Sequence, residues 1–164
     1  MESIKKDKKA LFLDRDGVLN YLISNRPPWD ISEIEFYSDA FEIVNLSIKR
    51  SFIPIIITNQ PDAGRGSISY KNLKDINSYI VKRLGIKYSY ICTHPYDGMC
   101  SCRKPLPGMI IEAVREHNIL IEESFLIGDR DKDIIAGNSA GCSTIKLSKI
   151  PSPIANYNVN KDNN

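Results

Sequence analysis

The sequence lacks an apolar run long enough to cross a membrane. Its longest run, 52–57, holds six residues, whereas a transmembrane helix needs about 20. The amino-terminal stretch MESIKKDKKA is basic but precedes no apolar segment of signal-peptide length. We therefore expect a cytoplasmic protein with no membrane partner.

The sequence also lacks a strong charge imbalance. Its 22 basic and 20 acidic residues give a net charge of +2, and no basic stripe alternates with aromatic residues, so we expect no nucleic-acid partner. The length of 164 residues predicts one globular domain over 1–150. A tail over 151–164, rich in Asn and Pro, follows it. For a single domain of this size we expect a monomer.

Cysteine and histidine are scarce, with four and two residues, yet most of them lie in one segment. That segment, CTHPYDGMCSCRKP, contains Cys92, His94, Cys100 and Cys102. Such crowding is typical of metal ligation in a reducing compartment rather than of a disulfide framework. Three thiolates and one imidazole form a common tetrahedral zinc set, with iron as the alternative metal. Because four protein ligands leave no open position, the sequence predicts a structural zinc in the loop 92–102.

Short apolar runs alternate with segments of helical period along the whole chain. The runs 10–13, 53–58, 88–92, 124–128 and 143–147 predict strands, and 39–50, 69–84, 108–117 and 131–140 predict helices. Buried strands joined by helices are typical of a parallel sheet. The sequence therefore predicts an α/β fold: a doubly wound, Rossmann-like, mostly parallel sheet with helices on both faces.

Acidic residues follow two of the predicted strands. Asp14 and Asp16 come directly after the first, and Asp129 and Asp133 come after the fourth. In such sheets ligands bind beyond the carboxyl ends of the strands. Four carboxylates at one edge would repel one another unless a cation neutralised them, and Mg2+ prefers oxygen ligands. A carboxylate nucleophile beside a metal predicts phosphoryl transfer.

Four short motifs carry a family resemblance. DRDGVLN, TNQ, RKP and GDRDKD, in that order and each at or just after a strand end, resemble the motifs of the haloacid dehalogenase-like phosphatases. The resemblance spans 10–147. It implies that Asp14 is the nucleophile and Asp16 the general acid. It also implies that Thr58 hydrogen-bonds the transferring phosphoryl group and that Lys104 offsets its charge.

The same resemblance implies a magnesium site. Asp14, the backbone carbonyl of Asp16 and Asp129 would hold Mg2+, and Asp133 would orient these ligands. For a phosphate monoester, whose uncatalysed hydrolysis is extremely slow, positioning and charge stabilisation must supply most of the acceleration.

Within that superfamily, the C-x-H and C-x-C-R-K-P arrangement resembles the D-glycero-D-manno-heptose 1,7-bisphosphate phosphatases and the related histidinol phosphatases. These lack a large cap domain, and no domain-sized insertion follows DRDGVLN or TNQ here. The resemblance implies that Arg103 binds the second phosphate of a sugar bisphosphate. The other residues expected to bind substrate are Asn59, Gln60, Arg65 and Arg130.

One segment departs from the best-known heptose enzymes. NRPPWDISEIEF resembles a variant found in less characterised relatives, which leaves the substrate open. Our leading hypothesis is removal of the 7-phosphate of a heptose 1,7-bisphosphate, on the route to lipopolysaccharide or another surface glycan. The alternatives are a histidinol-phosphate phosphatase, another small-molecule or DNA 3′-phosphatase, and a non-catalytic zinc-bearing binding module.

Overall fold

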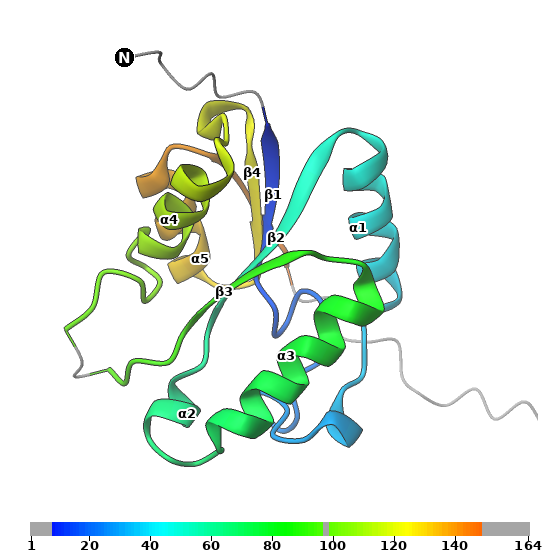
Figure 1. Ribbon diagram of the computed structural model, residues 1–164, viewed down its shortest axis with the longest axis vertical. Coiled ribbons are helices and arrows are strands. Elements are labelled where there is room, and N and C mark those ends of the chain that lie inside the picture. The colour runs from blue at the N-terminus through cyan, green and yellow to red at the C-terminus, as the bar shows by residue number, and fades with distance from the viewer. Residues whose placement is uncertain (1–7, 97–98, 149–164) are drawn as a thin grey trace, which may run out of the picture.

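The structure, a computed structural model, describes residues 8–96 and 99–148, so the predicted tail 151–164 lies outside the described residues. Its centre is a five-stranded sheet in the order β3-β2-β1-β4-β5 (Figure 1). The strands are β1 Lys9–Leu13, β2 Phe52–Asn59, β3 Tyr88–Cys92, β4 Phe125–Gly128 and β5 Ser143–Lys146. Every pairing between them is parallel, which confirms the predicted sheet.

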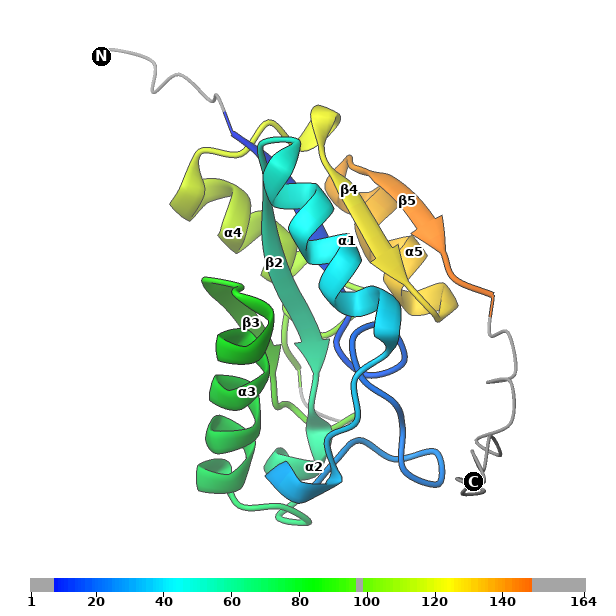
Figure 2. The same ribbon diagram turned by 90° about the vertical axis from the view of Figure 1, so that its right-hand side faces the viewer.

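Helices cover both faces of the sheet. The helices α1 Ser38–Lys49 and α3 Tyr70–Leu84 pack on one face, and α4 Gly108–His117 and α5 Asp131–Ala140 pack on the other (Figure 2). Alternate residues of a strand point to opposite faces. In β1, Leu11 and Leu13 accordingly join the first core cluster, while Ala10 and Phe12 join the second. A strand buried on both faces reads as a continuous apolar run.

Helix α3 follows directly from its sequence. Its apolar positions Leu73, Ile76, Ile80 and Leu84, spaced by three and four, are all buried. Ser69 caps its amino terminus, and Gly85, with φ 70°, ends it in the left-handed conformation. Burial of each such side chain stabilises the fold by about 1.5–3 kcal/mol.

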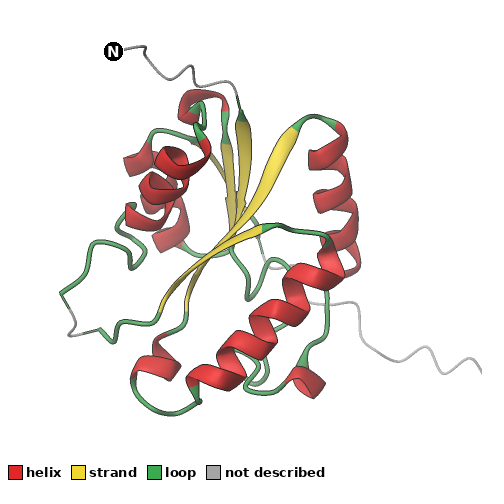
Figure 3. Cartoon of the chain, in the orientation of Figure 1, coloured by secondary structure: helices red, strands yellow, loops and turns green. Residues whose placement is uncertain are grey.

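The segments at the carboxyl edge of the sheet are mostly loops (Figure 3). Among their described residues they contain only the short α2 Pro61–Gly64 and the 3-10 turn η1 Ile31–Glu33. A second 3-10 turn, η2 Ile121–Glu123, precedes β4. In the described part of the chain no domain-sized cap interrupts the fold, as expected from the sequence. No helix among these residues is both long and apolar enough to span a membrane.

The strand order places a crevice at one point of the carboxyl edge. From β1 the chain moves outward to β2 and β3, and then returns to β4 on the other side of β1. Ligands of open α/β sheets bind where the strand order reverses in this way. Asp14 follows β1 here, and its backbone N–H donates to the Ile127 carbonyl of β4 at 3.0 Å.

Candidate active site and metal centres

Three buried carboxylates meet at the β1/β4 crevice. Oxygens of Asp14, Asp129 and Asp133 lie within 4.8 Å of one another. The Lys104 ammonium lies 2.8 Å from Asp14 Oδ1 and 2.7 Å from Asp133 Oδ1, and it donates to the Ile57 carbonyl at 2.9 Å. One ammonium cannot balance three buried negative charges. The donor set and its charge fit a hard divalent cation such as Mg2+.

Two glycines make room for this cluster. A Cβ at Gly17, which has φ +92°, would lie 2.5 Å from Asp129 Oδ2. A Cβ at Gly128 would lie 2.2 Å from the Asp133 Cβ. Side chains at either position would displace the carboxylates, so the close approach explains why Gly follows the first acidic pair and precedes the second.

Burial raises the pKa of Asp14 to about 6. The negative charges of Asp133 and Asp16 act in the same direction, and the Lys104 ammonium opposes them. A cation bound among the carboxylates would favour the ionised form of Asp14. Metal binding and deprotonation of this carboxyl group are therefore linked.

A cluster of donors fixes Asp16. Arg15, fully buried, donates to both carboxylate oxygens at 3.1 and 3.0 Å. Asn20 donates to the same carboxylate at 2.9 Å, and Gln60 at 2.5 Å. No role was predicted from the sequence for Arg15 or Asn20, although an arginine between two functional carboxylates could have indicated one. Gln60, expected to line the pocket, is buried against Asp16 and Thr58 instead.

Asn59 positions the loop that carries the buried lysine. Its side-chain amide donates to the Lys104 carbonyl at 3.0 Å, and its Oδ1 accepts from the Lys104 N–H at 3.0 Å. The end of β2 is thereby tied to a residue that follows the predicted zinc loop. Thr58, buried at the end of the same strand, lines the pocket beside Asp14 and Asp16.

The carboxylates Asp14 and Asp16 face a pocket of about 250 Å³ with a strongly cationic wall. Five basic side chains line it: Arg26, Arg65, Arg103, Arg130 and Lys132. Three of them, Arg65, Arg103 and Arg130, were predicted from the sequence, while Arg26 and Lys132 were not. Burial lowers the pKa of Lys132, against the opposing effect of Asp14.

Arg103 is held from two sides. Its guanidinium donates to the His94 carbonyl at 2.7 Å and stacks 3.8 Å from the centre of the Tyr96 ring. Arg65 lies 5.2 Å from the same ring. A guanidinium fixed by a hydrogen bond and a ring face loses little freedom when it binds an anion.

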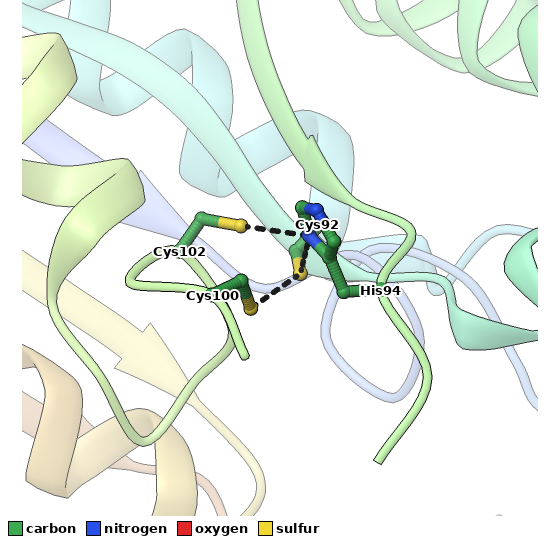
Figure 4. Close-up of side chains that lie close together, drawn as sticks. All are labelled: Cys92, His94, Cys100 and Cys102. Carbon is green, nitrogen blue, oxygen red and sulfur yellow. Dashed lines mark hydrogen bonds between the residues drawn. The ribbon is translucent and has the colours of Figure 1, made fainter. Parts of the chain in front are cut away.

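The loop 92–102, of which all but 97–98 is described, gathers the four predicted metal ligands (Figure 4). His94 Nδ1 lies 3.4 Å from Cys92 Sγ and 3.3 Å from Cys102 Sγ, and the sulfurs of Cys92 and Cys100 are 3.9 Å apart. Tetrahedral zinc with bonds of about 2.3 Å to sulfur and 2.0 Å to nitrogen requires sulfur–sulfur separations of roughly 3.8 Å and sulfur–nitrogen separations of roughly 3.5 Å. The ligand set fits zinc, and none of the thiols forms a disulfide.

Comparison with known proteins decides the family. A D-glycero-beta-D-manno-heptose-1,7-bisphosphate 7-phosphatase of Helicobacter pylori is 36% identical over 138 residues, covering 80% of this chain and 79% of that protein. A D-glycero-alpha-D-manno-heptose-1,7-bisphosphate 7-phosphatase of Campylobacter jejuni is 34% identical over 142 residues, covering 85% and 81%. The chain belongs to the haloacid dehalogenase-like phosphatases. The family model described as HAD-hydrolase-like matches residues 101–148.

A crystal structure of another haloacid dehalogenase-like phosphatase has the same fold. It is the D,D-heptose 1,7-bisphosphate phosphatase from B. bronchiseptica, complexed with magnesium and phosphate. The TM-score is 0.77 at 27% sequence identity, and the match covers 83% of this chain and 78% of that one.

This chain also has a larger hollow of about 1010 Å³, lined in part by Cys100 and Ser101 of the Cys/His loop. It is lined by exposed apolar side chains, among them Met99, Leu106 and Ile111, and it shares no lining residue with the cationic pocket. Size alone does not locate the chemistry, because the carboxylates and the ammonium face the smaller pocket.

Proposed function

We propose that this phosphatase uses Mg2+ to remove the 7-phosphate from a D-glycero-D-manno-heptose 1,7-bisphosphate. The observation that carries the proposal is the buried Asp14–Lys104 pair beside Asp129 and Asp133, opening into a pocket walled by arginines. Relatives that this chain matches over about four-fifths of its length carry this activity in their names. The reaction would supply a heptose 1-phosphate for surface-glycan synthesis.

The proposed reaction has two displacements at phosphorus. Asp14 attacks the phosphorus of the 7-phosphate. The bond between that phosphorus and the sugar oxygen breaks, and Asp16 donates a proton to the departing oxygen. Water then attacks the aspartyl-phosphate, Asp16 takes a proton from the water, and inorganic phosphate leaves as Asp14 is regenerated. Thr58 hydrogen-bonds the transferring oxygens, and the Lys104 ammonium offsets their charge.

Magnesium in this proposal is held by Asp14, the Asp16 backbone carbonyl and Asp129. When bound, it neutralises charge on the transferring phosphoryl oxygens. Asp133, whose Oδ2 accepts from the Arg130 N–H at 3.0 Å, keeps both Lys104 and the ligands oriented. Magnesium bound to the B. bronchiseptica enzyme supports the choice of ion.

Zinc in this proposal is structural and is held by Cys92, His94, Cys100 and Cys102. Arg103 accordingly binds the second phosphate of the substrate, because the carbonyl of His94 fixes its guanidinium at the pocket wall. Arg65 and Arg130 supply further positive charge along the same wall. Asn59 lines the pocket as well, while Gln60 supports it from behind.

The test compares phosphate release from three substrates at matched concentrations. These are heptose 1,7-bisphosphate as both anomers, histidinol phosphate and a 3′-phosphorylated oligonucleotide, each with Mg2+ and with EDTA. We expect metal-dependent release, with kcat/KM for one heptose anomer at least a hundredfold above the other two classes, about 2.7 kcal/mol in transition-state binding. A preference for histidinol phosphate would refute the substrate, and no release from any of them would refute the activity.

A further inference from the structure

Lys132 lies on a ridge between two hollows. It is the second residue of α5 and lines the cationic pocket together with Asp14 and Thr58. It also lines an adjoining hollow of about 430 Å³, whose floor includes Lys104 and Leu106. Of the residues that the structure describes, three are common to the two hollows: Tyr96, Arg103 and Lys132. An anion held by Arg103 on this ridge is therefore beside the Lys132 side chain.

The basic side chains of the pocket wall differ in whether a carboxylate neutralises them. Arg26 pairs with Glu33 at 2.6 Å, and Arg65 contacts Asp62 at 3.5 Å. Arg103 and Lys132 form no ion pair with a carboxylate in the described part of the chain. Arg130 has only a 3.9 Å contact with the Asp129 carboxylate. Uncompensated positive charge is thus concentrated on the ridge and next to it.

We propose that Lys132 is a specificity-determining residue, whose ammonium binds the second phosphate of the substrate jointly with the Arg103 guanidinium. The inference rests on the proposed function, since it assumes a substrate with two phosphates. The transferring phosphoryl group already meets the Lys104 ammonium, which is buried against Asp14. Lys132 is half-buried and lines the same two hollows as Arg103, so it lies near the guanidinium that binds the second phosphate.

The Arg103 guanidinium and the Lys132 ammonium suit the second phosphate because they can bind different oxygens of it. A planar guanidinium binds two phosphate oxygens side by side, whereas an ammonium acts as a compact charge that reaches a third. A phosphate monoester carries a charge of about −1.5 to −2 at pH 7. One cation leaves much of that charge unbalanced, and two nearly neutralise it.

The test uses the variant Lys132→Met, which keeps the length of the side chain and removes its charge. Lys132→Arg is the conservative rescue, and Lys82→Met on the exposed surface of α3 is the matched control. Each is assayed on heptose 1,7-bisphosphate and on heptose 7-phosphate, which lacks only the second phosphate. Because the variant removes a charge-assisted hydrogen bond, we expect at least a tenfold loss of kcat/KM on the bisphosphate, about 1.4 kcal/mol.

For Lys132→Met the loss on the bisphosphate should appear as a higher KM, while kcat/KM on the monophosphate should change by less than about threefold. Lys132→Arg should recover most of the lost kcat/KM on the bisphosphate. Lys82→Met should keep the wild-type kcat/KM on both substrates. Equal losses on both substrates, or no loss on the bisphosphate, would overturn the proposal. A second measurement separates binding from turnover. The affinity for heptose 1,7-bisphosphate is measured by calorimetry in the Asp14→Asn variant, which does not consume the substrate, with and without Lys132→Met. A tenfold weaker binding on adding Lys132→Met supports the role of Lys132 even if the wild-type enzyme prefers another phosphate ester. Unchanged binding, or no binding of the bisphosphate, contradicts it.

Discussion

Replacement of Lys104 by Met tests whether the carboxylate cluster depends on one buried cation. The Lys104 ammonium is the shared partner of Asp14 and Asp133, at 2.8 and 2.7 Å, and all three side chains are buried. Removing one partner of a buried ion pair costs about 3–5 kcal/mol because it leaves a charge uncompensated. We expect the upper part of this range without metal, since two carboxylates lose their partner.

The assay is urea unfolding followed by circular dichroism, with EDTA and with saturating Mg2+. With a slope of about 2 kcal/mol per molar urea, a loss of about 4–5 kcal/mol should lower the midpoint of Lys104→Met in EDTA by roughly 2–2.5 M. Mg2+ should stabilise the variant more than the wild type, because the cation restores the charge balance of the cluster. The exposed Lys82→Met should change the free energy of unfolding by less than about 0.5 kcal/mol.

Two results would refute this reasoning. If Lys104→Met unfolds in EDTA at the wild-type urea concentration, the ammonium does not compensate the carboxylates. If Mg2+ shifts the midpoints of the wild type and the variant equally, the ion does not bind within the cluster.

Four further predictions concern the carboxylates, Gly128 and the Cys/His loop. Asp14→Asn and Asp16→Asn should each abolish turnover with an unchanged circular dichroism spectrum, and near-wild-type activity in either would refute the mechanism. Mg2+ affinity, measured by calorimetry, should fall about tenfold per pH unit below about pH 6, because protons then compete with the metal for Asp14. Burial raises the pKa of this carboxyl group to about 6. A constant affinity from pH 7.5 to 5 would contradict this link. Cys102→Ser should reduce the zinc content of the purified protein and lower its melting temperature, and full zinc occupancy would rule out this ligand. Gly128→Ala should destabilise the fold by about 1–3 kcal/mol, because its Cβ would lie 2.2 Å from that of Asp133; wild-type stability would mean that Asp133 can move aside.

The sequence predicts the sheet and its helices because their signals are local. The strands are buried on both faces, so each reads as a short apolar run, and the spacing of apolar residues in α3 marks one helix face. The four-residue α2 has no room for such a pattern and was missed. The positions of Asp14 and Asp129 were predictable for a related reason, since both directly follow a strand at the same edge of the sheet.

Partners distant in the chain were not predictable. The Asn59 side chain lines the pocket, but its pairing with the backbone of Lys104, 45 residues away, could not be foreseen. Gln60, expected in the pocket wall, donates to Asp16 44 residues away. A single sequence identifies residue types suited to an active site, but which of them face the pocket and which support it depends on long-range packing. Lys132 was missed for this reason, because its position on the ridge depends on Arg103 from another loop.

The most direct test of the account is the position of the phosphate that is removed. Heptose 1,7-bisphosphate is incubated with the wild-type enzyme, and the products are resolved by phosphorus NMR with Mg2+ and with EDTA. We expect inorganic phosphate and intact heptose 1-phosphate with Mg2+, and no reaction with EDTA. Accumulation of heptose 7-phosphate, or equal rates with and without the metal, would contradict it.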